Sequence, residues 1–178
     1  MKYAYKLMDS PVGQLTLVAN GESLAAILDK SAAYAEQHGL DLVDARLAPD
    51  MYTLARQVQL ACHHATDGVA RLTGGQPSNG SQKAATLPAL KQLIADTITA
   101  VSQVPATAFE AAESRDCSIQ IPNGGGVLAM NGLQFLRAWA LPHFYFHVVT
   151  AYDILRHEGV TLGKRDYLGS VGRYLRPA

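Results

Sequence analysis

Residues 141–157, LPHFYFHVVTAYDILRH, decide the fold class. Apolar side chains recur in this stretch at steps of three and four, the spacing of one face of an α-helix. The stripe comprises Tyr145, Val148, Tyr152 and Leu155. Pro142 predicts a kink or a restart, because proline has no backbone N–H and its ring clashes with the preceding helical turn. We therefore expect a long, interrupted helix over residues 133–157 that stops at Gly159.

The same periodicity predicts three more helices upstream, over residues 23–38, over residues 51–73 with Asp50 as the N-cap, and after the N-cap Thr86. Two β-hairpins are also predicted. One pairs YAYKLM (3–8) with QLTLVA (14–19), and the other pairs CSIQIP (117–122) with VLAMN (127–131) across a glycine-rich turn. The expected fold is mainly α: an up-and-down four-helix bundle with an N-terminal β-hairpin and a small β-hairpin before the last helix.

These elements predict three parts in the chain. Residues 1–22 form an N-terminal hairpin appendage, residues 23–169 the four-helix bundle domain, and residues 170–178 a basic C-terminal tail. The Asn-Gly pair at residues 20–21 favours a turn. The first helix is therefore expected to begin near Ser23, after the hairpin.

Composition narrows the classes of partner. Fifteen Lys and Arg residues balance fifteen Asp and Glu residues, so there is no electrostatic reason to expect a nucleic acid or an anionic membrane as partner. No apolar run is long enough to span a bilayer, and no signal peptide is recognisable. Cys62 and Cys117 make no disulfide framework, which is typical of a reducing compartment. We expect a cytoplasmic protein.

The chemically most promising pattern is a pair of histidines. His143 and His147 are four residues apart, so on a helix their Cβ atoms lie about 6 Å apart on one face. Two neutral imidazoles at that spacing can hold one Zn²⁺ or Ni²⁺, but a third ligand must come from another helix. At 100° per residue, His64 falls at the edge of the second helix's core stripe, whereas His63 points roughly away from the core. His64 is therefore the expected third ligand. The alternative is that these are surface or hydrogen-bonded bundle histidines.

A family resemblance covers residues 24–169. It rests on four blocks: LAAILDK (24–30), ARLAPDMYTLARQVQLA (45–61), LPHFYFHVVTAYDILRHEGV (141–160) and LGKRDYLG (162–169). Here the chain resembles an uncharacterised bacterial domain-of-unknown-function family of the DinB/YfiT-like four-helix bundles. Many proteins of that wider group bind a divalent metal through one second-helix histidine and two last-helix histidines, and some are thiol-dependent transferases or hydrolases. His143 and His147 match the last-helix pair. The position that matches the second-helix histidine of that group falls near Gln57, which is not a histidine. His64 would therefore have to take its place as the third ligand.

A second resemblance covers only the start of the chain. From Lys2 to about Ile27, the stretch YKLMDSPVGQLTLVANGESLAAIL is similar to the beginning of methylated-DNA–protein-cysteine methyltransferases. Those enzymes need a Pro-Cys-His-Arg acceptor block, and neither Cys62 nor Cys117 lies in one. Without that activated thiolate there is no nucleophile for alkyl transfer, which disfavours this activity.

Two functions therefore remain from the sequence. The first is a divalent-metal-binding hydrolase or thiol-dependent transferase that acts on an unidentified small molecule, with the metal at His64, His143 and His147. The second is a non-catalytic bundle that associates with itself as a homodimer or binds a partner. Glutamine at position 57, where the resemblance implies a ligand, favours the second function.

Overall fold

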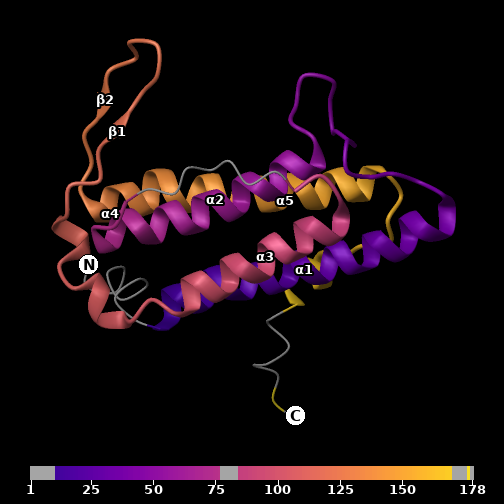
Figure 1. Cartoon of the computed structure of the whole chain (residues 1–178), viewed down its shortest axis with the longest axis horizontal. Coiled ribbons are helices and arrows are strands. Elements are labelled where there is room, and N and C mark those ends of the chain that lie inside the picture. Colours follow the sequence, from indigo (N-terminus) through magenta and orange to yellow (C-terminus); the bar gives the residue numbers. More distant parts are fainter. Residues whose placement is uncertain (1–10, 77–83, 170–175, 177–178) are drawn as a thin grey trace.

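Four long helices lie side by side in the computed structural model, which describes residues 11–76, 84–169 and 176 (Figure 1). They are α1 (Pro11–His38), α2 (Leu54–Thr73), α3 (Leu87–Ser102) and α5 (Leu141–His157). The shorter elements are the 3₁₀ turns η2 (Ala106–Phe109) and η3 (Ala112–Ser114), strands β1 (Ile119–Gln120) and β2 (Val127–Leu128), α4 (Gly132–Phe135), the π-helical segment η4 (Leu136–Ala140) and α6 (Lys164–Tyr167). A mainly helical fold with a small antiparallel hairpin is confirmed.

The order of the helices around the bundle differs from the up-and-down prediction. Both α1 and α2 pack against α3 and α5, so the consecutive helices α1 and α2 lie diagonally opposite each other. The Gln59 side-chain amide donates to the Ala84 carbonyl at 3.0 Å, which places the beginning of α3 beside the beginning of α2. Helices α2 and α3 therefore run in the same direction (Figure 1). A simple up-and-down order, with each helix beside the next, is not confirmed.

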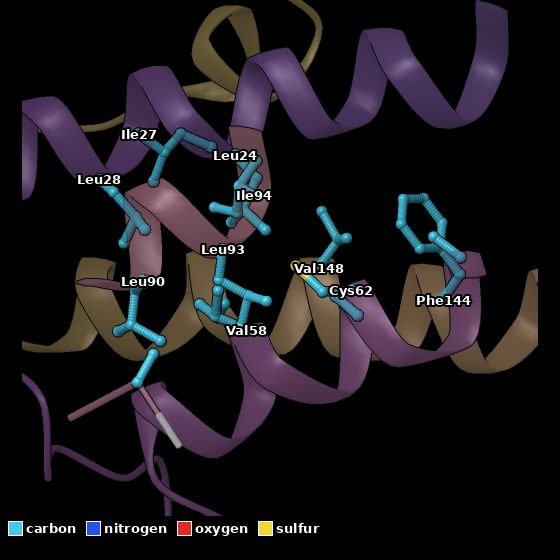
Figure 2. Close-up of a cluster of buried hydrophobic side chains, with 14 of the residues drawn as sticks. Leu24, Ile27, Leu28, Val58, Cys62, Leu90, Leu93, Ile94, Phe144 and Val148 are labelled. Atoms are coloured by element: carbon cyan, nitrogen blue, oxygen red, sulfur yellow. The ribbon is translucent and has the colours of Figure 1, made fainter. Parts of the chain in front are cut away.

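The core lies between the four helices, and Figure 2 shows part of it. The stripe predicted for the second helix is buried in full: Leu54, Val58, Ala61, Ala65, Val69 and Leu72. Helix α5 contributes Phe144, Val148, Ala151, Ile154 and Leu155. Removing this apolar surface from water is the main stabilising term for such a bundle, at about 25 cal/mol per Å².

The start of α1 corrects the sequence prediction. The helix begins at Pro11, so a start near Ser23 and a strand over residues 14–19 are both wrong. Pro11 suits the first turn of a helix, where its missing N–H costs nothing. Gly21, which indicated a turn, lies inside α1 where that helix approaches α3. A Cβ placed there would lie 3.0 Å from Cγ1 of Ile98. The glycine thus serves close helix packing rather than a turn.

Two predicted segments lie outside the described part of the chain. They are the strand expected over residues 3–8 and the basic tail over 170–178, apart from residue 176.

Local chemistry explains the other helix ends. The Thr53 hydroxyl, rather than Asp50, caps α2 by accepting a hydrogen bond from the Arg56 N–H at 3.2 Å. Thr86 caps α3 in the same way, as predicted. The interruption predicted at Pro142 is the π-helical segment η4, which ends directly before α5. Such a segment accommodates the proline by changing the hydrogen-bond register of the preceding turn.

The predicted hairpin before the last helix is confirmed. Strands β1 and β2 are antiparallel, with Ile119 opposite Leu128 and Gln120 opposite Val127. The hairpin projects from one end of the bundle (Figure 1). Its base is held by Arg71 of α2, which forms an ion pair with Asp67 and donates to the Ser118 carbonyl at 3.4 Å. Across the described residues, no helix combines the length and the hydropathy needed to cross a membrane.

Candidate functional site

Three histidine rings from two helices lie next to one another between α2 and α5. The ring centroid of His64 on α2 is 4.7 Å from that of His143 and 5.4 Å from that of His147, both on α5. We call these three residues the histidine cluster. His63 lies at its edge, 5.3 Å from His64 between ring centroids. The structure thus brings together all three residues proposed from sequence as metal ligands.

The packing of α2 against α5 produces this arrangement. The two helices run antiparallel, since Gln57 near the start of α2 contacts His147, while Gly68 farther along α2 faces Ala140. A Cβ on Gly68 would lie only 3.4 Å from the Ala140 Cβ, so small residues let the helices approach closely. His147 is buried, whereas the other members of the cluster are half-buried. The cluster is therefore partly exposed to solvent at His64 and His143.

Hydrogen bonds determine which ring nitrogens carry protons. Nδ1 of His143 lies 2.8 Å from the Trp139 carbonyl oxygen, and Nδ1 of His147 lies 2.7 Å from Oε1 of Gln57. Both partner oxygens can only accept, so each Nδ1 must be the donor. In a neutral imidazole the other nitrogen then carries a lone pair. His143 and His147 therefore each offer Nε2 as a potential metal ligand.

The environment keeps two of the rings, those of His64 and His147, neutral. Burial is the main cause that lowers the pKa of His64 from 6.5 to about 3, and the nearby His143, His147 and His63 contribute to the same shift. Burial also lowers the pKa of His147 to about 4, aided by His143 and Arg56. At neutral pH both rings are uncharged, which is the protonation state that binds metal ions.

The ring orientations are not those of an assembled metal site. Within residues 11–76 and 84–169, no group of three or more His, Cys, Asp or Glu side chains is arranged to hold a metal ion. The rings of His64 and His147 are stacked with an angle of 7° between their planes. Coordinated imidazoles must instead direct one nitrogen each at a common point, about 2.0–2.1 Å away for zinc. No hydrogen bond from a described residue holds the His64 ring, so this ring is the one that must turn.

Sequence reasoning missed two neighbours of the cluster. Gln57 was considered only as a ligand position occupied by the wrong residue, yet it is the hydrogen-bond partner of His147. Trp139 packs its ring 4.3 Å from that of His143 and supplies the carbonyl that His143 contacts. The four-residue spacing of Trp139 and His143 could have indicated the second contact, because such residues are neighbours on a helix.

The two cysteines do not join this site. Both are buried free thiols. Burial raises the pKa of Cys62 to about 11 and also raises that of Cys117. A protonated, buried thiol is a poor nucleophile, so neither cysteine is suited to covalent chemistry at neutral pH.

Comparison with known protein families and solved structures shows which proteins this chain is related to. Residues 14–168 match the family described as "Domain of unknown function (DUF1993)". The chain belongs to the DUF1993 family. A solved structure, described as a DinB family member protein from Shewanella denitrificans at 1.83 Å resolution, is 37% identical in sequence with a TM-score of 0.77. The alignment covers 98% of this chain and 93% of that one, which supports a DinB-like superfamily. Comparison with curated proteins gave no match.

The DUF1993 match also bears on the first residues of the chain. It begins at residue 14 and so includes most of the segment that is similar to methyltransferases. In the structure that segment continues into α1. The methyltransferase resemblance is not supported.

Proposed function

We propose that this DUF1993 protein binds one divalent transition-metal ion, Zn²⁺ or Ni²⁺, through His64, His143 and His147. We further propose that the bound ion serves hydrolysis or thiol-dependent group transfer on a small molecule. The observation that carries the proposal is the contact of three histidine rings from two helices, two of them with Nε2 left as an acceptor.

The donor set fits such an ion. Neutral imidazole nitrogens suit Zn²⁺ and Ni²⁺, and three protein ligands leave a coordination position for water or substrate. The partners of the two Nδ1 atoms are of the kind that orients metal-bound histidines in other proteins, a backbone carbonyl and a buried side-chain oxygen. Binding requires one local change, rotation of the His64 ring out of its stack with His147.

The residues of the site then have separate tasks. His143 and His147 present Nε2 from one face of α5, and His64 completes the set from α2. Trp139 packs against the His143 ring and limits its rotation. His63 lies half-buried at the edge of the cluster, with its ring beside that of His64. A bound ion would supply Lewis acidity, which lowers the pKa of a water or thiol in the open position.

Metal analysis of the purified protein tests this proposal. The wild-type protein, stripped with a chelator and then titrated with Zn²⁺ or Ni²⁺, should bind one ion per chain. Binding should also raise its unfolding temperature, because a ligand that binds only the folded state stabilises it by about 2.7 kcal/mol at one hundred times Kd. His143→Ala should lose both effects. His157→Ala removes an exposed histidine from the same helix and should keep them. A wild-type protein that neither binds nor is stabilised would refute the proposal.

One observation favours the alternative of a self-associating bundle. On α5, the side chains of Phe146 and Val149 are 58% and 39% exposed. They lie on the outer side of the helix, where a second copy could cover them, giving a homodimer. Light scattering on the wild-type protein and on Phe146→Ser tests this function. A dimer that the substitution converts to a monomer supports it, and a monomeric wild type counts against it.

A further inference from the structure

We infer that Gln57 is a positioning residue that fixes His147 in the Nδ1–H tautomer and thereby keeps the lone pair on its Nε2, the nitrogen that can bind a metal ion. The inference rests on the proposed function for its consequence, metal binding. The hydrogen bond itself can be tested without metal.

The hydrogen bond between Gln57 and His147 is short, and both side chains are shielded from water. Gln57 is 1% exposed and His147 is 6% exposed, and 2.7 Å separates Oε1 of the one from Nδ1 of the other. Water therefore does not compete for either group. A buried polar atom that loses its partner pays its full desolvation penalty, so the two side chains hold each other in place.

The direction of this hydrogen bond follows from a backbone carbonyl. The side-chain NH₂ of Gln57 donates to the Tyr52 carbonyl oxygen, 3.5 Å away. That oxygen precedes α2, which begins at Leu54. A carbonyl can only accept, so the amide turns its NH₂ toward Tyr52 and its Oε1 toward the imidazole. Oε1 in turn can only accept, so Nδ1 of His147 must donate. The Tyr52 carbonyl thus orients the Gln57 amide, and the amide allows His147 only the Nδ1–H tautomer.

The neighbouring histidine shows why Gln57 can be tested so directly. His143 obtains the same tautomer from the Trp139 backbone carbonyl, which no substitution removes. His147 obtains it from a side chain ninety positions away in sequence. Glutamine is also neutral, so it sets the tautomer without adding the negative charge that an acidic partner would place beside the site.

The first readout is the tautomer in metal-free protein. Histidine-labelled protein, treated with chelator, gives two-bond ¹H–¹⁵N correlation spectra in which the two tautomers have different patterns. Wild-type His147 should be Nδ1–H. Gln57→Met removes the acceptor at similar volume and should produce a substantial Nε2–H population. Gln57→Glu keeps an acceptor and should retain Nδ1–H. Gln59→Met makes the same exchange two residues away, where the amide bonds to Ala84, and should leave the His147 pattern unchanged.

The second readout is affinity for Zn²⁺. Loss of a histidine's outer hydrogen-bond partner commonly costs 10–100-fold in metal affinity. We expect a loss of about that size for Gln57→Met, a smaller change for Gln57→Glu and none for Gln59→Met.

The outcomes separate this inference from the proposed function. A wild-type His147 in the Nε2–H form overturns the inference, as does a Gln57→Met protein that keeps pure Nδ1–H. This holds whether or not the protein binds zinc. If wild-type protein binds no zinc but its His147 tautomer depends on Gln57, the positioning role stands and the proposed function fails. The wild-type spectrum alone can overturn the inference, so the inference can still be refuted if a variant folds poorly.

Discussion

Lowering the pH should destabilise this protein through its neutral histidines. The folded state holds the pKa of His64 near 3 and that of His147 near 4, whereas an unfolded histidine titrates near 6.5. Between these values the unfolded chain binds protons that the folded chain does not. This contribution to stability is therefore fully present above about pH 6.5 and is lost as the pH falls toward about 4 for His147 and about 3 for His64.

The size of the effect follows from the same values. One pH unit below its unfolded pKa, a histidine kept neutral by folding costs about 1.4 kcal/mol. Two such residues set an upper limit near 3 kcal/mol at about pH 5.5. Because the His64 ring is partly exposed and screened by solvent, we discount this sum to on the order of 1–2 kcal/mol.

Urea denaturation at about pH 7.5 and at about pH 5.5 measures this loss directly. The double variant His64→Gln/His147→Gln lacks both titrating groups, so its unfolding free energy should change with pH by about 1–2 kcal/mol less than that of the wild type. His157→Gln removes an exposed histidine and should keep the wild-type dependence. If the double variant and the wild type lose the same stability between the two pH values, burial does not hold His64 and His147 in their neutral forms.

Three further predictions concern the fold. Backbone chemical shifts over residues 14–22 should be helical, since this segment belongs to α1, and strand-like shifts would contradict that assignment. Gly21→Val should cost about 1–3 kcal/mol in urea denaturation, because its side chain would meet Ile98 across the α1–α3 contact; a neutral or stabilising result would show that the helices are not so close. Ile154→Ala, at a fully buried site, should cost about 2–5 kcal/mol, whereas Val149→Ala on the outer side of α5 should change stability by less than about 0.5 kcal/mol; equal costs would place both residues in one environment.

The helices whose faces repeat cleanly could be predicted from sequence. The stripe from Leu54 to Leu72 is buried as its spacing indicates. Thr86 caps α3 because its hydroxyl accepts a hydrogen bond from the Ala89 N–H, and Pro88 is tolerated in the first turn. Helical geometry also brought His64 rather than a more distant residue to the α5 pair. The stripe and the cap each depend on residues within a few turns of one another. For His64 the same local spacing sets only the side of α2 on which it lies, and its contact with the α5 pair comes from the packing of the two helices.

The failures involve contacts between distant segments. Gly21 has the local character of a turn residue, and only the approach of α3 explains why it lies inside a helix. The diagonal placement of α1 and α2 depends on how whole helices pack, which a periodic stripe does not encode. The role of Gln57 could not be predicted either, because its partner His147 lies on another helix. At these positions tertiary packing overrides local preference.

The most direct test of the central proposal is a crystal structure of the zinc-loaded protein, with diffraction recorded at the zinc absorption edge. We predict one anomalous peak per chain, about 2.0–2.1 Å from a ring nitrogen of each of His64, His143 and His147. The His64 ring should have turned out of its stack with His147, while the hydrogen bond from His147 to Gln57 remains. A peak held by other residues, or a histidine cluster without zinc in crystals grown at saturating zinc, would contradict the proposed metal site.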